Sequence, residues 1–330
     1  MMPEQERKPS AQHDQSIDAT QAPKAESAVE KQPAVTTVPP AASFGELTGE
    51  SATEPKKAET PPPLADEDAV VEQLAHGMVA KDLDGKDEAF LKTNGYDALP
   101  IIRGEHEFVM RTFVPTQAGK PPIVAFRGTV PSKAQTLIAD LDPSGIGMYQ
   151  FNPNRALIQD QMNAAAGHGK IISAGHSLGG ALAQIAAATF PDLVGRIVTF
   201  QAPGVSKETA KKLEDYNKEN PDEAIESSHH RVKGDLVPLG GEALTPGVIH
   251  NHEMKDGNLF QRNPIAKHTS MPLAQEELAK GNDVPVHGDR EMVYTGDTTT
   301  EQENANKSQV IEHARAGLGK LVFGVGKLFN

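Results

Sequence analysis

Residues 175–183 read GHSLGGALA and place Ser177 among small residues. The apolar run 170–174 before this stretch predicts a short strand, and the small apolar residues after it predict a helix. Ser177 therefore lies at a sharp turn that strains the residue at its apex, while Gly175 and Gly179 let strand and helix approach closely. The pattern is typical of a nucleophile elbow, which holds a serine hydroxyl in the open. The alternative is a glycine-rich turn that only packs a helix on a sheet.

Strands and helices alternate on both sides of this turn. Strand-like runs are expected at 107–115, 121–129, 170–174, 196–203 and 229–235. Helical spacing of apolar residues is found at 66–78, 155–165, 178–186 and 207–216. Alternation of this kind predicts an α/β fold with a largely parallel sheet and helices on both faces.

The composition divides the chain into three expected parts. Residues 1–64 are rich in Pro, Ala, Ser and charged residues, with Phe44 as their only aromatic residue, so we expect a disordered arm. Residues 65–295 carry the alternating pattern and are expected to form the α/β domain. Residues 296–330 are expected to be a polar linker followed by an amphipathic helix.

Charge and cysteine content exclude several classes of function. The formal net charge of −13 argues against nucleic acid as a partner. With no cysteine, the chain has neither a disulfide framework nor a thiolate metal site. Its histidines lack the spacing of a metal-binding motif, so no metal and no other cofactor is expected.

A serine nucleophile requires a histidine to take its proton and a carboxylate to orient the imidazole. Asp235 follows a strand and precedes a turn, which is where the acid of an α/β hydrolase is found in the chain order Ser, Asp, His. His268 lies in an expected loop from which it could reach Ser177. His250 and His252 alternate in the strand-like stretch 247–254 and stay open as alternatives, as does His287.

These motifs resemble the class 3 lipase family of the α/β-hydrolase fold. The matching stretches are IVAFRGT (123–129), LIADLD (137–142), GHSLGGALA (175–183), VTFQAPGV (198–205) and DLVP (235–238), in the family's order. The resemblance implies Ser177 as nucleophile and Asp235 as the acid of the triad. It also implies an oxyanion hole made by the backbone N–H groups of Thr129 and Leu178. Gly128 gives an independent reason to expect the N–H of Thr129 as a donor, because a glycine at a strand end lets the next N–H turn towards the helix N-terminus.

The loop 143–151, PSGIGMYQF, carries apolar residues between glycines and polar residues. These are Ile146, Met148, Tyr149 and Phe151. Burial in the core would explain them. The family resemblance implies instead a lid or a wall for an acyl chain, and thus a role in substrate binding.

We therefore expect a serine carboxylic ester hydrolase that acts on lipid esters, a lipase or phospholipase. A non-lipid esterase or thioesterase, and a hydrolase fold used only for binding, are the alternatives. The apolar stripe in 314–330 predicts docking on the domain or contact with a membrane surface. A partner of the N-terminal arm is not identified by its sequence. No signal peptide or membrane-spanning run is found, which predicts a cytoplasmic protein or one exported by a specialised bacterial system.

Overall fold

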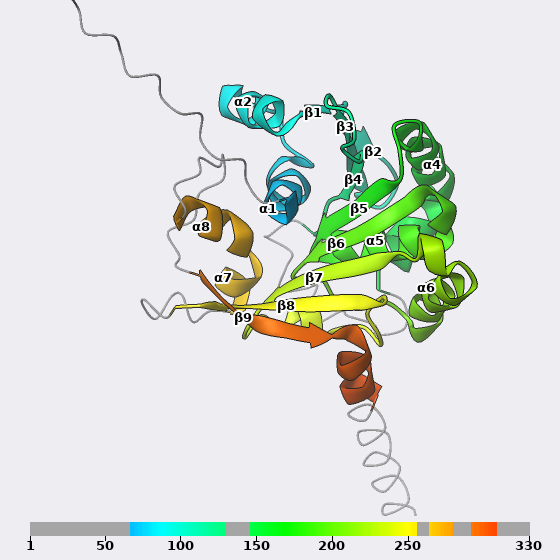
Figure 1. The fold of residues 1–330 in the computed structure, drawn as a ribbon. Coiled ribbons are helices and arrows are strands. Elements are labelled where there is room, and N and C mark those ends of the chain that lie inside the picture. The colour runs from blue at the N-terminus through cyan, green and yellow to red at the C-terminus, as the bar shows by residue number, and fades with distance from the viewer. Residues whose placement is uncertain (1–66, 130–145, 256–263, 280–291, 309–330) are drawn as a thin grey trace, which may run out of the picture. The chain divides into compact units, whose positions relative to one another are not determined.

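The computed structural model describes residues 67–129, 146–255, 264–279 and 292–308. The expected arm (1–64), the motif at 137–142, His287 and the stripe at 314–330 lie outside these residues. The described chain is built around one nine-stranded sheet (Figure 1).

The sheet is parallel at its centre and antiparallel at its edges. Its strands are β1 (Tyr96–Ala98), β2 (Ile102–Arg103), β3 (Val109–Pro115), β4 (Ile123–Phe126), β5 (Ile171–His176), β6 (Val194–Phe200), β7 (Glu226–Val232), β8 (Gly247–Met254) and β9 (Met292–Thr299). Their order is β1-β3-β4-β5-β6-β7-β8-β9, with β2 also paired to β3. Strands β4 to β8 run parallel, whereas the pairs β1–β3, β2–β3, β3–β4 and β8–β9 are antiparallel.

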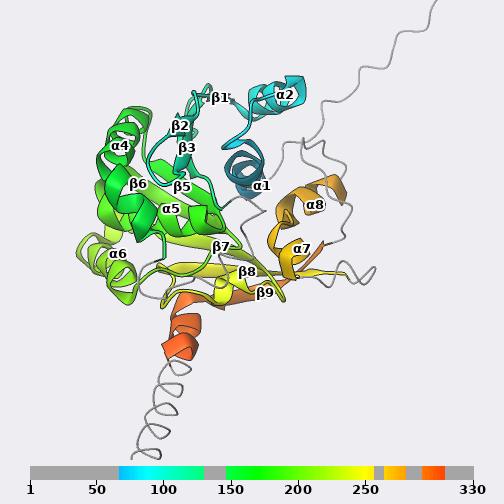
Figure 2. The ribbon, with the colours of Figure 1, turned by 180° about the vertical axis from the view of Figure 1, so that it is seen from behind.

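Helices cover both faces of this sheet (Figures 1 and 2). On one face lie α4 (Met148–Ala166), α5 (Leu178–Thr189) and α6 (Lys207–Glu219). On the other lie α1 (Glu67–Glu72), the π-helix η1 (Gln73–Met78), α2 (Gly85–Asn94), α7 (Pro264–His268) and α8 (Pro272–Ala279). Short 3₁₀ turns complete the connections at η3 (Pro191–Leu193), η4 (Pro221–Glu223) and η5 (Val237–Leu239). The expected α/β fold, with its largely parallel sheet between helices, is thus confirmed.

Alternation along the buried strands divides the core into two layers. On β4, Val124 and Phe126 belong to the cluster beneath α4 and α5, while Ile123 and Ala125 belong to the cluster beneath α1, η1 and α2. All four are completely buried. Since successive side chains of a strand point to opposite faces, an uninterrupted apolar run is what a strand between two helical layers requires.

One expected helix boundary is wrong. Helix α4 begins at Met148 rather than near Arg155, because Gly147 adopts a left-handed conformation (φ +85°) that starts it there. Pro153 is accommodated near the helix start, where its missing N–H removes one backbone hydrogen bond.

The sheet also continues past residue 295, where the domain was expected to end. Strand β9 pairs with β8, for example Val248 with Thr299, and residues 300–308 form a helix. In that helix Lys307 donates hydrogen bonds to the carbonyl oxygens of Pro238 and Gly240, both at 3.0 Å. The beginning of the expected linker is therefore part of the folded domain. None of the helices in the described ranges has both the length and the apolar character needed to cross a membrane.

Candidate active site

Ser177 is the single residue between β5 and α5, and its backbone is strained. Its φ of 58° and ψ of −132° lie in a region that residues with a side chain rarely adopt. Close packing enforces the turn: a Cβ on Gly175 would lie 2.2 Å from the carbonyl carbon of Gly179, and one on Gly179 would lie 2.1 Å from the carbonyl oxygen of Phe126. The backbone N–H of Ser177 donates to the carbonyl oxygen of Phe200 at 2.9 Å. The expected elbow geometry is thus present.

His268 lies between Ser177 and Asp235. Its Nε2 is 2.8 Å from Oγ of Ser177, and its Nδ1 is 2.9 Å from Oδ2 of Asp235. All three residues are buried, with Ser177 only 2% exposed. Asp235 follows β7, and its second carboxylate oxygen accepts the backbone N–H of Val237 at 3.0 Å. His268 ends the short helix α7 instead of lying in a loop as expected.

The chemistry of these partners assigns the protons. An ionised carboxylate only accepts hydrogen bonds, so Nδ1 of His268 carries the hydrogen that is shared with Asp235. Nε2 of the neutral ring is then free to accept the hydroxyl hydrogen of Ser177. This arrangement can move a proton from the serine to the imidazole and stabilise the imidazolium that results.

The two expected oxyanion donors are Leu178, which directly follows Ser177, and Thr129, which follows β4. Leu178 is the first residue of α5, so its N–H belongs to the first turn, where backbone donors have no partner inside the helix. Thr129 follows β4 and lines a cavity of about 390 Å³ together with Gly128 and His176. A Cβ on Gly128 would lie 2.9 Å from Cβ of Ser177, so the chain next to Thr129 passes directly over the elbow.

The four expected substrate residues are found in different environments. Ile146 and Phe151 are buried in the core beneath α4 and α5, and Met148 packs against that core. Tyr149 is 71% exposed, and its ring lies 4.0 Å from that of His106. None of the four is among the described residues that line the cavity beside His176. A role in substrate binding stays a prediction.

The alternative histidines have other partners. His250 contacts Asp297 on the neighbouring strand β9, with Nδ1 2.7 Å from Oδ1. His252 is buried and lies between His230 and Glu276. The structure thus brings His268, and neither His250 nor His252, to Ser177.

Sequence reasoning missed the residues that hold the chain at 268–270. Nε2 of His176 donates to the carbonyl oxygen of His268 at 2.7 Å, and the ring of His76 stacks on that of His176 with centroids 3.7 Å apart and planes at 4°. Burial lowers the pKa of His176 well below its ordinary value and that of His76 to about 4, so both rings are neutral. Nε2 of Gln201, whose φ is 44°, donates to the carbonyl oxygen of Ser270 at 2.8 Å. His176 and Gln201 lie in the quoted stretches GHSLGGALA and VTFQAPGV, which were visible signals, whereas nothing local marks His76.

Within the described ranges, no group of three or more histidine or acidic side chains is arranged to hold a metal ion. The site contains a hydroxyl, an imidazole and a carboxylate that are hydrogen-bonded in a row next to the N-terminus of α5.

A mostly parallel sheet with a strained serine at the step from its central strand to a helix is the architecture of the α/β hydrolases. Residues 80–258 match the model of the Tle-like phospholipase domain, described as phospholipase-like. The match covers more than half of the 330 residues, and the chain belongs to this family. It is a lipid ester hydrolase, and the class 3 lipase resemblance fits this assignment.

Solved structures similar to this chain include three fungal lipases. The lipase from Rhizopus microsporus var. chinensis is 19% identical, with a TM-score of 0.41 over 59% of this chain and 80% of its own. Lipase II from Rhizopus niveus is 21% identical, with a TM-score of 0.39 over 56% and 77%. The triacylglyceride lipase from Rhizomucor miehei is 16% identical, with a TM-score of 0.40 over 58% and 80%. A search of curated proteins gives no match.

Proposed function

We propose that the chain cleaves carboxylic esters of phospholipids through an acyl-enzyme on Ser177, with His268 as base and Asp235 as its orienting acid. The observation that carries this proposal is the position of His268, within 2.8 Å of the hydroxyl of Ser177 and 2.9 Å of the carboxylate of Asp235. Hydrogen-bond reach to both partners is the geometric condition for a general base.

The reaction follows from these contacts. Oγ of Ser177 attacks the ester carbonyl carbon while Nε2 of His268 takes the hydroxyl proton. The resulting oxyanion is stabilised by the backbone N–H groups of Leu178 and Thr129, with the N-terminal end of the α5 dipole behind them. When the C–O bond breaks, His268 returns the proton to the leaving alcohol. Water then attacks the acyl-enzyme with His268 again as base, which releases the fatty acid and restores Ser177.

The family description supports a phospholipid as substrate. A serine that transfers acyl groups cleaves the carboxylic esters of such a lipid and leaves its phosphodiester bonds intact. The products are therefore a free fatty acid and a lysophospholipid. Contact of the C-terminal stripe with a membrane surface, and the compartment of the protein, stay predictions from the sequence.

The test compares Ser177→Ala and His268→Ala with His250→Ala as a matched histidine control. Fatty acid release from phosphatidylcholine vesicles and labelling by a fluorophosphonate probe are measured on the full chain. Both site variants are expected to lose at least about 10⁴-fold in kcat, because members of a triad act as a unit. His250→Ala is expected to keep activity and labelling. An active and labelled His268→Ala, or a Ser177→Ala that keeps a per cent of wild-type turnover, would refute the assignment.

A further inference from the structure

Three titratable residues lie at four-residue intervals on the first helix, and the proposed reaction does not use them. They are Asp68 and Glu72 of α1 and His76 of η1. Asp68 and Glu72 are buried, and His76 is partly buried. Residues four apart share one face of a helix, so the three form one polar face, which we call the 68–72–76 face. Polar groups are costly to bury without partners. Asp68 forms an ion pair with Arg196 of β6, whose Nη1 lies 2.7 Å from its Oδ1. Further contacts of each of the three residues lead to segment 268–276.

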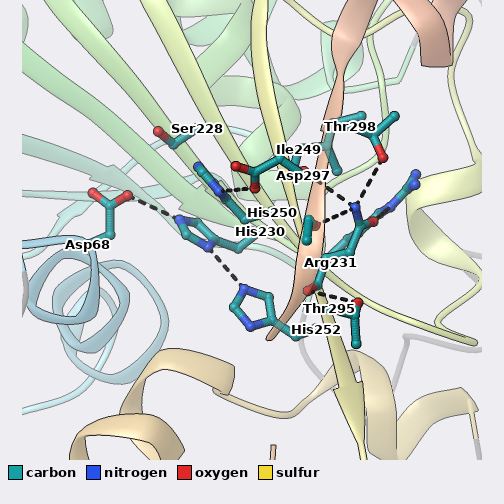
Figure 3. A network of polar contacts seen from close by, with 12 residues as sticks. Asp68, Ser228, His230, Arg231, Ile249, His250, His252, Thr295, Asp297 and Thr298 are labelled. Carbon is teal, nitrogen blue, oxygen red and sulfur yellow. Dashed lines mark hydrogen bonds and ion pairs between the residues drawn. The ribbon is translucent and has the colours of Figure 1, made fainter. Parts of the chain in front are cut away.

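Asp68 is connected to Glu276 of segment 268–276 through two imidazoles, those of His230 and His252. Figure 3 shows the contacts from Asp68 to His252. Oδ2 of Asp68 lies 3.1 Å from Nε2 of His230, and Nδ1 of His230 lies 3.2 Å from Nε2 of His252. Nδ1 of His252 lies 3.1 Å from Oε1 of Glu276 on α8. The row of rings therefore connects α1 to α8 across strands β7 and β8.

Glu72 reaches the same helix directly. Its Oε2 accepts the backbone N–H of Ala274 at 2.8 Å, in the first turn of α8. The side chain is completely buried, and burial raises the pKa of its carboxyl well above the ordinary value. A buried acceptor at the start of a helix satisfies a backbone donor that has no partner inside the helix.

His76 reaches His268 itself through one intervening ring. It stacks on His176, whose Nε2–H donates to the backbone carbonyl oxygen of His268. The rings of His176 and His268 are 4.9 Å apart and inclined at 35°. Nδ1 of His76 has no hydrogen-bond partner in the described part of the chain, so no hydrogen bond at this atom holds the ring in place. The π-helical turn carries His76, and such turns often occur at functional sites.

We propose that the 68–72–76 face positions His268 for proton transfer. Its three residues hold segment 268–276 at three points: the carbonyl of His268, the N–H of Ala274 and the carboxylate of Glu276. They are positioning residues, because each acts through another group and none touches Ser177 or Asp235 in the described contacts. The proposal rests on the function of His268 as base proposed above. A displacement of about 1 Å at a reacting group costs about 100-fold in rate, so loss of one support is expected to lower kcat.

The decisive comparison is His76→Leu with His76→Phe in the full chain. Both replacements are apolar and fill space, but only phenylalanine presents a flat ring to His176. We expect His76→Leu to lower kcat and the rate of fluorophosphonate labelling at least tenfold with KM within twofold of wild type. His76→Phe should stay within threefold for all three quantities. His168→Ala, which removes an exposed histidine, serves as the control.

Two variants of Glu72 give a second, independent comparison. Glu72→Gln keeps an oxygen acceptor for the N–H of Ala274 and should stay within threefold of the wild-type labelling rate, whereas Glu72→Leu should be at least tenfold slower. Equal labelling rates for Leu and Phe at position 76 would overturn the proposal. If His76→Leu does not fold, the Glu72 pair decides, and equal rates there overturn it. These outcomes are distinct from failure of the proposed function, which would appear as an active Ser177→Ala.

Discussion

Lowering the pH from 7 to 5 is expected to destabilise the folded chain, because several buried imidazoles are neutral in it. His229 shows the cause most clearly. Its Nε2–H donates to the carbonyl oxygen of Thr245 at 3.1 Å, and its Nδ1 accepts the hydroxyl hydrogen of Thr199 at 2.7 Å. The neutral ring is therefore fully hydrogen-bonded, and a second proton would place a positive charge in a buried site. Burial lowers the pKa of His229 to about 4.

The sign and the size follow from proton counting. An unfolded histidine, with a pKa of about 6.5, binds a proton as the pH falls through that value, whereas folded His229 stays neutral down to about pH 4. The unfolded state thus gains protons that the folded state does not, and stability present above pH 6.5 is lost as the pH falls. Each such group contributes about 1.4 kcal/mol per pH unit inside its window.

Other buried groups increase or decrease this change of the free energy of unfolding with pH. Burial also lowers the pKa of His76, His176 and His230, which gives four histidines of the same sign. Glu72 has the opposite sign, because its raised pKa keeps a proton on the folded chain that the unfolded chain has released. If all four histidines stay neutral in the folded chain and Glu72 keeps its proton, the net difference of three protons corresponds to a loss of about 4 kcal/mol per pH unit between pH 6 and 5. That is a large part of the roughly 5–15 kcal/mol that stabilises a typical domain.

The measurement is urea unfolding followed by circular dichroism at pH 7, 6 and 5. The far-ultraviolet signal is the suitable probe because the chain contains no tryptophan. The free energy of unfolding should fall at each step. In His229→Gln the loss between pH 6 and 5 should be smaller by about 1 kcal/mol, the contribution of one histidine. His168→Gln, at an exposed position, should leave the slope unchanged. A free energy that is constant or rises from pH 7 to 5 would show that these imidazoles are not held neutral.

Two further predictions concern packing. In Gly128→Ala the new Cβ would lie 2.5 Å from the carbonyl oxygen of His176, so we expect at least tenfold slower fluorophosphonate labelling of folded protein. Gly85→Ala, where a Cβ meets nothing within 4 Å, should label at the wild-type rate, and equal rates for the two variants would contradict the packing argument. Phe151→Ala should lower the free energy of unfolding by about 3–5 kcal/mol in urea titrations, because it empties a buried site. Tyr149→Ala, at an exposed site, should change it by about 0.5 kcal/mol or less, and a similar loss for both would show that Tyr149 is also part of the core.

The sequence was most informative where the physics is local. The elbow could be predicted from a strand, a serine between glycines and a helix, because the constraint acts over a few consecutive residues. The parallel strands could be predicted from uninterrupted apolar runs such as 123–126. The start of α4 could not, because Gly147 and Pro153 each resemble a helix breaker when considered alone.

Contacts between distant parts of the chain could be predicted only in part. Asp235 and His268 were expected from chain order, but the choice of His268 over His250 and His252 depends on how α7 returns to the end of β5. Nothing in the pattern of 66–78 separates a buried polar face from the polar side of an ordinary surface helix. Only the fold shows that Asp68, Glu72 and His76 point towards α8 and the elbow rather than to solvent.

The family match covers only part of the proposed site. Residues 80–258 contain Ser177 and Asp235 but end before His268 and begin after His76. The proposed base and the helix that supports it therefore come from opposite ends of the described chain and meet at the carboxyl end of β5. In a parallel sheet, strand ends gather at one edge, so segments that are far apart in sequence can complete a site that the matched stretch only begins. Variation in how firmly residues 67–78 hold segment 268–276 would thus change the rate of acyl transfer without altering any residue that touches the substrate.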